Sequence, residues 1–204
     1  MKYIVWLLCL VLSNVAFSQM TEEASLYEFI NGKVYKYSSN GEGKSLGLKI
    51  NLKYPMSWKS QEGERPHIVR KFTQSDGYAN AIIYIEKTDN VFTEEEISEQ
   101  LCTESMKNAA NTLGTYISSS NNLKIEGLRA SYVEYTATNQ RMERVIFSYN
   151  LNYQFFYKNY YVGFMCGVPD KIGETKESVK SRYNKIKSLF TMMFNSIVID
   201  NVYD

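Results

Sequence analysis

Apolar and polar residues alternate strictly from Leu46 to Lys53, and this period of two predicts a half-buried β-strand. Pro55 ends the strand, and the polar stretch 57–66 after it predicts a loop. Two short connections, Ser75-Asp76-Gly77 and Asn139-Gln140, predict hairpins, so that neighbouring strands run antiparallel. Six further segments carry a strand pattern: 67–73, 79–88, 116–125, 128–138, 142–156 and 160–168.

Two segments follow the period of a helix instead. Thr93 and Glu96 fit a capping box and predict a helix that runs to Leu113, before Gly114. Its apolar stripe consists of Cys102, Met106, Ala109 and Leu113. A second helix is predicted over 175–197, with its own stripe of Val179, Tyr183, Ile186, Phe190, Met193 and Ile197.

The order of these elements predicts the α+β class and a single domain. A strand and a hairpin precede the first helix, and a meander of strands precedes the second. Two amphipathic helices can cover opposite faces of one sheet, so we expect an antiparallel β-sheet covered by helices on both faces, an α/β/α sandwich. This domain is assigned to 46–204, and 19–45 is an N-terminal extension with a mixed pattern. Leu26, Phe29 and Ile30 fit one helical turn there, while Val34, Tyr35 and Tyr37 fit an extended piece.

The first eighteen residues have the pattern of a secretory signal peptide. Lys2 precedes an apolar run over 3–12, and Ala16 and Ser18 supply the small residues of a cleavage site before Gln19. The apolar run is half of the roughly 20 residues that a membrane span needs. Leu8 before Cys9 does not fit a lipoprotein signal. We therefore expect a secreted or periplasmic protein without a membrane span.

Charge and composition narrow the function classes. The chain has 23 basic and 22 acidic residues, which argues against a nucleic-acid binder that neutralises phosphates with a basic excess. A single histidine, His67, excludes multi-histidine metal sites, and no Gly-x-Ser-x-Gly motif marks a nucleophile. The sequence thus predicts no catalytic residue, no metal site and no cofactor.

Two cysteines remain after export, Cys102 and Cys166, and an oxidising compartment permits their pairing. Cys102 lies on the apolar stripe of the first helix, and Cys166 shares a strand face with Val162 and Phe164. We expect the two to lie near each other and to be able to form a disulfide. Two buried free thiols are the alternative, because parity along a strand does not determine which face a helix covers.

Aromatic residues crowd between Tyr149 and Tyr161. One alternate set, from Val145 to Phe155, is apolar, and the other set is polar: Ser148, Asn150, Asn152 and Gln154. Strict alternation is typical of a strand with one face in the core and one in water. The alternative is a binding surface in which Tyr153 and Tyr157 contact a ligand or a partner.

The segment Ile50-Asn51-Leu52-Lys53-Tyr54-Pro55, followed by Trp58, resembles the opening of PsbP-like proteins. The strands over 68–72 and 82–86 and the closing Phe194-Asn195-Ser196-Ile197 extend the resemblance to most of the chain after residue 46. The resemblance implies an α/β/α sandwich, and the family includes many exported bacterial proteins without assigned activity. Other members are an extrinsic subunit of photosystem II and a Ran-binding import factor. In Tyr54, Pro55 and Trp58 we expect structural roles, with Pro55 turning the chain and Trp58 closing the core edge.

The family acts mostly by docking to other proteins and has no shared catalytic motif. With the signal peptide, this favours an exported non-enzymatic module that binds an unidentified envelope protein. A small-ligand or glycan binder that uses Tyr153 and Tyr157 is the second hypothesis. A hydrolase with an unidentified site is the third.

Overall fold

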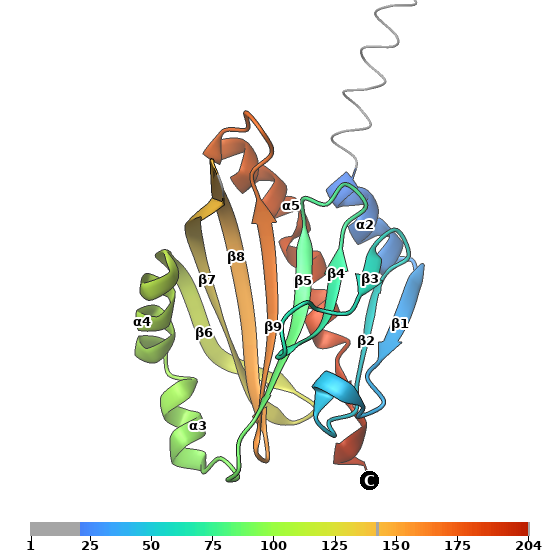
Figure 1. Cartoon of the computed structure of the whole chain (residues 1–204), viewed down its shortest axis with the longest axis vertical. Coiled ribbons are helices and arrows are strands. Elements are labelled where there is room, and N and C mark those ends of the chain that lie inside the picture. The colour runs from blue at the N-terminus through green and yellow to red at the C-terminus, as the bar shows by residue number, and fades with distance from the viewer. Residues whose placement is uncertain (1–20, 142, 204) are drawn as a thin grey trace, which may run out of the picture.

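The computed structural model describes residues 21–141 and 143–203 (Figure 1). The signal peptide expected over 1–18 and its cleavage site lie outside these residues. The helices are α2 (Thr21–Ile30), α3 (Glu94–Gln100), α4 (Thr103–Leu113) and α5 (Lys176–Asn195). The strands are β1 (Val34–Ser38), β2 (Ile50–Pro55), β3 (Lys59–Gln61), β4 (Ile68–Thr73), β5 (Asn80–Lys87), β6 (Thr115–Ile125), β7 (Leu128–Arg141), β8 (Arg144–Tyr157), β9 (Tyr160–Pro169) and β10 (Val198–Ile199).

The described strands form two antiparallel sheets. The larger has seven strands in the order β3-β4-β5-β9-β8-β7-β6, and the smaller has the order β1-β2-β10. Tight hairpins connect the neighbours from β6 to β9 in the larger sheet. In the β6–β7 hairpin, Glu126 and Gly127 both have positive φ, of 49° and 79°, as in the two-residue turns that match the twist of paired strands. Chain order and strand pairing therefore agree from β6 to β9.

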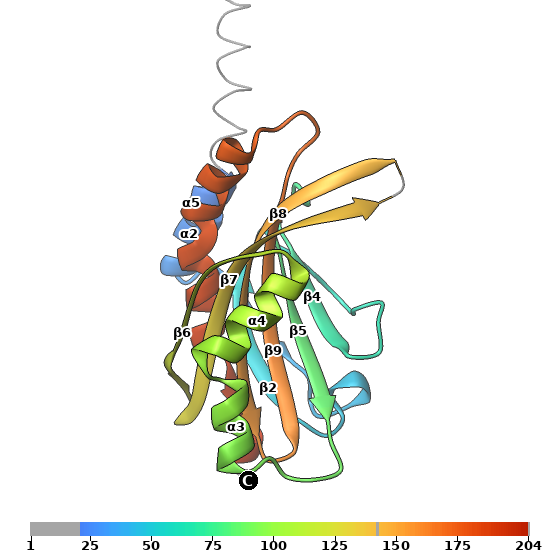
Figure 2. The ribbon, with the colours of Figure 1, turned by 90° about the vertical axis from the view of Figure 1, so that its left-hand side faces the viewer.

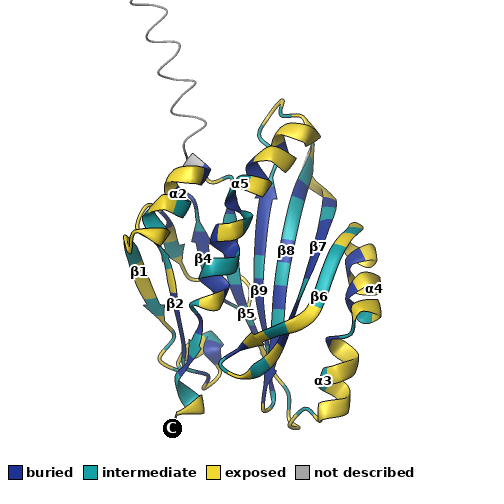
Figure 3. Cartoon of the chain, turned by 180° about the vertical axis from the view of Figure 1, so that it is seen from behind, coloured by how far each residue is buried: buried dark blue, intermediate teal, exposed yellow. Residues whose placement is uncertain are grey.

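The main core lies between the larger sheet and α5, which crosses behind the sheet in Figure 1 and in front of it in Figure 3. The helix buries a stripe that includes Tyr183, Ile186, Phe190 and Phe194. The ring of Phe194 stacks on that of Tyr153 with centroids 4.3 Å apart. Burial of this apolar stripe provides the main packing energy of the fold.

The opposite face of the larger sheet is not covered in the same way, and the prediction of an α/β/α sandwich with helices on both faces is wrong. Of the described helices, α3 and α4 lie at one edge, and α4 packs against β6 and β7 (Figure 2). Only Met106 and Ala110 of α4 are buried there, in a small cluster with Val133, Tyr135 and Ala137. The middle of this face carries the polar side chains of β8, of which Gln154 reaches the end of α3 by donating to the Gln100 carbonyl, while Ser148 and Asn150 line a hollow.

A break in the predicted first helix explains why it covers only a small part of the sheet. The capping box at Thr93 is confirmed, with the Glu96 carboxylate accepting a hydrogen bond from the Thr93 N–H at 2.7 Å. The helix nevertheless ends at Gln100, and Cys102 begins a second helix as its N-cap. The predicted stripe thus lies wholly within α4 and its N-cap, and two of its members, Ala109 and Leu113, are exposed.

The strand Ile50–Pro55 belongs to the smaller sheet, between β1 and β10. Trp58 follows it and is 3% exposed, with its indole N–H donating to the Ser25 hydroxyl at 3.0 Å. The Trp58 ring meets the ring of Phe190 edge-on. Tyr54 packs between the rings of Tyr35 and Phe72. These residues join the smaller sheet and α2 to the main core.

Candidate functional site

A hollow of about 560 Å³ opens on the face of the larger sheet opposite α5. Its floor is made by the adjoining ends of β5, β9 and β8, where Asn80, Gly167 and Asn150 pair in one row. The residues next to them in each strand, Ala81, Cys166 and Leu151, belong to the main core on the other face. The strict alternation along three neighbouring strands therefore produces a polar floor directly behind an apolar core.

Gly167 shapes the centre of this floor. A Cβ atom at this position would lie 3.3 Å from Asn150 Oδ1 and 3.7 Å from Asn80 Oδ1, so the two amide groups approach each other over the glycine. The Asn150 amide donates to the Ser148 hydroxyl at 3.0 Å, which fixes its orientation and leaves its oxygen toward the hollow. Among the described residues, no hydrogen bond occupies the Asn80 amide. The floor thus offers both donors and acceptors.

Two projecting segments form the walls. The β7–β8 hairpin, with Asn139 and Arg141, bends away from α5 on the opposite side of the sheet (Figure 2). The second wall is the 61–65 segment between β3 and β4. Its Gly63 packs directly on Ile68, where a Cβ would come within 2.2 Å of the isoleucine side chain. Lys44 holds this segment by donating to the Gly63 carbonyl and by pairing with Glu62 at 3.1 Å.

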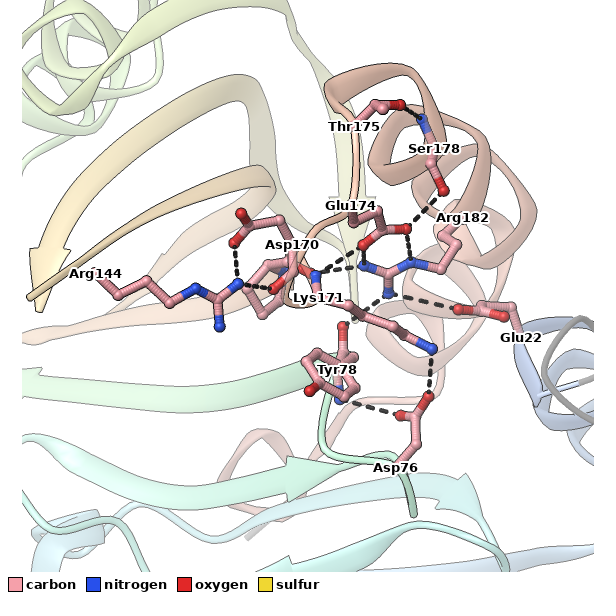
Figure 4. Close-up of polar contacts among 11 residues, drawn as sticks. Glu22, Asp76, Tyr78, Arg144, Asp170, Lys171, Glu174, Thr175, Ser178 and Arg182 are labelled. Carbon is pink, nitrogen blue, oxygen red and sulfur yellow. Dashed lines mark hydrogen bonds and ion pairs between the residues drawn. The ribbon is translucent and has the colours of Figure 1, made fainter.

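A buried network around Arg182 holds the end of the sheet that bears the hollow (Figure 4). Its guanidinium donates to both Glu174 carboxylate oxygens, at 2.8 and 2.7 Å, and to the Pro169 carbonyl at 2.7 Å. Glu22 of α2 lies 3.6 Å from the same guanidinium. Arg182 therefore links α5, α2 and the end of β9.

The carboxylate of Glu174 stays charged in this network. Burial alone would raise its pKa, but hydrogen bonds from Arg182, the Lys171 N–H and the Ser178 hydroxyl outweigh burial and lower the pKa to about 2. Two further ion pairs extend the network to the walls and turns. Arg144 in the β7–β8 hairpin pairs with Asp170 at 3.0 Å, and Lys171 pairs with Asp76 at 3.3 Å.

Tyr153 and Tyr157, the ligand contacts considered from the sequence, lie on the other face of the sheet. Tyr153 is 3% exposed under α5, its hydroxyl lies 2.8 Å from that of Thr191, and burial raises its pKa. Tyr157 is also buried and donates to the Asn201 carbonyl at 2.7 Å. Both hydroxyls are thus bound within the protein, and neither side chain lines the hollow.

The structure does not bring Cys102 and Cys166 together, and both are free thiols. Cys166 is buried in the main core on the α5 face. Cys102 caps α4, which packs on the opposite face, and its sulfur accepts a hydrogen bond from the Ser105 N–H at 3.4 Å. The sheet therefore separates the two sulfurs, and this geometry favours the alternative of two free thiols.

The remaining chemical candidates, His67 and the acidic side chains, are not gathered into one cluster among the described residues. The exposed His67 ring lies 5.5 Å from the ring of Tyr84. No three His, Cys, Asp or Glu side chains in residues 21–141 and 143–203 gather as metal ligands. None of the helices in that part of the chain combines the length and apolar character that crossing a bilayer requires.

From the sequence alone, the polar residues of β8 are expected on a solvated face, and no site is predicted there. Two signals were present: the run Ser148, Asn150, Asn152, Gln154 on one face, and the glycines Gly163 and Gly167 within the next strand. Glycine inside a strand often marks a place where another group approaches the backbone closely. The pairing of Gly167 with Asn80 and Asn150 required the strand order, which the sequence alone did not define.

Comparisons with known proteins add little to this description. No family model matches the chain, and no curated protein matches it. Among solved structures, a protein from Bacteroides thetaiotaomicron VPI-5482 is similar with a TM-score of 0.44 and 14% sequence identity, over 82% of this chain and 48% of that one. The chain therefore spans about half the length of that protein, and a likeness of this degree assigns no function.

Proposed function

We propose that this chain is an exported, non-enzymatic binding protein that holds a small polar ligand in the hollow on the sheet face opposite α5. The observation that carries the proposal is the Asn80–Gly167–Asn150 row, where amide groups with free hydrogen-bonding capacity converge over a position without a side chain. The export part rests on the signal pattern over 1–18.

The size and lining of the hollow favour a small ligand over a protein surface. About 560 Å³ lies within the range of roughly 300–1,000 Å³ that is typical of small-molecule sites. Protein interfaces generally have an apolar centre with aromatic anchors. Here the centre is made of amides and a glycine, and the lining contains no aromatic side chain.

The chemistry of the lining favours binding over catalysis. It supplies amide, hydroxyl, ammonium and guanidinium groups and the two wall carboxylates of Glu62 and Glu64, with neither an imidazole nor a thiol beside them. The Ser148 hydroxyl accepts a hydrogen bond from the Asn150 amide, a group that is not basic enough to activate a nucleophile. These groups are suited to holding a ligand by hydrogen bonds.

The experiment is a ligand screen by NMR that follows the side-chain amide signals of Asn80 and Asn150. A library of sugars, sugar acids, amino acids and dipeptides is added to the protein purified after export. We expect at least one class to shift both signals. Gly167→Val, which fills the floor, should abolish the shifts, whereas Gly163→Ala on the same strand and face should retain them.

Asn80→Ala provides a second test that leaves the backbone unchanged, in case Gly167→Val alters β9. Folding of each variant is checked by its thermal transition. If no library member shifts the two amide signals, or if Gly167→Val and Asn80→Ala leave the shifts intact, the hollow is not the binding site.

A protein partner in the envelope is a second candidate, and a different observation favours it. The strand β1 lies at an edge of the smaller sheet, and its Tyr35 is 49% exposed. An exposed strand edge can pair with an extended segment of another protein. A photo-crosslinking residue at Tyr35 should then capture one defined envelope protein in the native host, and the same residue at Lys124 on β6 should not.

A further inference from the structure

We infer that the ligand of the hollow is a small sugar acid, in which a carboxylate is bound beside ring hydroxyls. This inference rests on the proposed function and specifies its ligand class. It is carried by the charge and the hydrogen-bonding groups of the lining.

Three cationic side chains reach the hollow from three separate segments. They are Arg65 in the β3–β4 wall, Lys71 on β4 and Arg141 in the β7–β8 hairpin. None of them is paired with a carboxylate of the described residues. In a chain with a net charge of only +1, three unpaired cations around one hollow form a local excess of positive charge.

The position of Lys71 follows from strand register. It pairs with Gln61 of β3 and with Ile82 of β5, and all three residues line the hollow. Lys71 is therefore directed to the face opposite α5 from a strand of the sheet, with its backbone paired on both sides. An ammonium held in this way is suited to binding an anion.

The acidic residues of the lining do not cancel this charge. Glu62 is one of two, and Lys44 neutralises it at 3.1 Å. Glu64, an exposed residue of the same wall, is the other. With Glu62 offset by Lys44, the three cations face a single remaining carboxylate, so the hollow favours a ligand with negative charge.

The floor specifies the rest of the ligand. The Asn80 amide and the Asn150 oxygen offer donors and an acceptor side by side, and hydroxyl groups both donate and accept. The lining has no aromatic ring on which a flat base or ring could stack. A compact ligand with several hydroxyls and one carboxylate satisfies the floor and the cations together.

The test measures binding by the shifts of the Asn80 and Asn150 amide signals. The probes are glucuronate and galacturonate, their neutral partners glucose and galactose, and glutamate as an acid without ring hydroxyls. At low salt we expect a sugar acid to bind about tenfold more tightly than its neutral partner, because hydrogen bonds to a charged group are stronger. The difference should narrow at about 0.5 M NaCl, where screening is strong. Glutamate should bind more weakly than the sugar acid.

Variants that remove one positive charge each test which side chains bind the carboxylate of the sugar acid. Lys71→Gln and Arg141→Gln should each weaken binding of the sugar acid about tenfold and leave binding of the neutral sugar unchanged. Lys59→Gln, on the neighbouring strand and outside the lining, is the matched control and should have no effect.

Equal binding of acid and neutral sugar would overturn the inference and leave the proposed function intact. Equal binding of glutamate would overturn the assignment to a sugar. If neither sugar acid shifts the two amides, the inference fails, and the library screen with Gly167→Val then decides the proposed function separately.

Discussion

The Arg182 guanidinium holds the Glu174 carboxylate through two parallel hydrogen bonds of 2.8 and 2.7 Å, at the end of the sheet where the hollow opens. The same arginine donates to the Pro169 carbonyl, and Pro169 lines the hollow. The face that bears the hollow and the buried ion pair are thus parts of one connected structure. Paired donors of this kind fix direction as well as distance.

Arg182→Met is expected to destabilise the protein by about 3 kcal/mol, because it leaves the Glu174 carboxylate buried without its partner. The measurement is urea unfolding followed by circular dichroism. Lys185→Met on the same helix breaks the exposed pair with Glu23 and should cost less than about 1 kcal/mol. Equal losses in the two variants would show that the buried pair has no special role.

Acid should destabilise the protein partly through Glu174. Its pKa is about 2 in the folded protein against 4.5 for the free group, so the unfolded chain binds the proton more readily. The contribution to stability is therefore fully present above about pH 4.5 and is lost as the pH falls toward 2. The free energy of unfolding should fall less steeply with decreasing pH in Glu174→Gln than in the parent protein. Parallel pH profiles for the variant and the parent would show that Glu174 does not cause the loss of stability in acid.

The two cysteines should differ in reactivity. Hydrogen bonds from Ser105 lower the pKa of the half-buried Cys102 thiol, and complete burial raises the pKa of Cys166. Iodoacetamide at pH 8 should therefore label Cys102 in the folded protein and Cys166 only after unfolding, as read by peptide mass spectrometry. Cys102→Ser should remove the native label. Failure of both residues to react in unfolded, unreduced protein would instead reveal a disulfide.

Gln74→Met should stabilise the protein by about 1 kcal/mol. Gln74 is 1% exposed, and among the described residues neither its amide nitrogen nor its amide oxygen has a hydrogen-bond partner. Replacing an unsatisfied buried amide by an apolar side chain of similar length removes that penalty. The thermal transition is the readout, and Gln61→Met at an exposed position is the control, with almost no change expected. A lower transition temperature for Gln74→Met would refute the argument.

The sequence defined local elements better than their arrangement. The strand predicted over 79–88 is found at Asn80–Lys87, and that over 160–168 at Tyr160–Pro169, because a period of two is a property of neighbouring residues. The helix predicted over 175–197 is found at Lys176–Asn195 for the same kind of reason. Each of these signals is contained within a single segment.

The errors concern relations between segments. Parity placed Cys166 with Val162 and Phe164, which is correct, but could not determine whether α4 or α5 covers that face. The assumption that the first helix would cover a whole sheet face depended on one uninterrupted helix, and the break at Cys102 removed it. The separate sheet of β1, β2 and β10 joins residues about 150 positions apart, such as Asn51 and Val198, for which no local pattern exists.

The walls of the hollow are built from segments that add nothing to the core beneath α5, so their sequence can change without changing the fold. Positions 62, 64, 65, 139 and 141 are exposed, while position 63 admits no side chain because of its contact with Ile68. A library randomised at those five positions should keep the melting temperature of the parent within a few degrees. Under the proposed function, such a library would offer the same fold with many different linings around one floor.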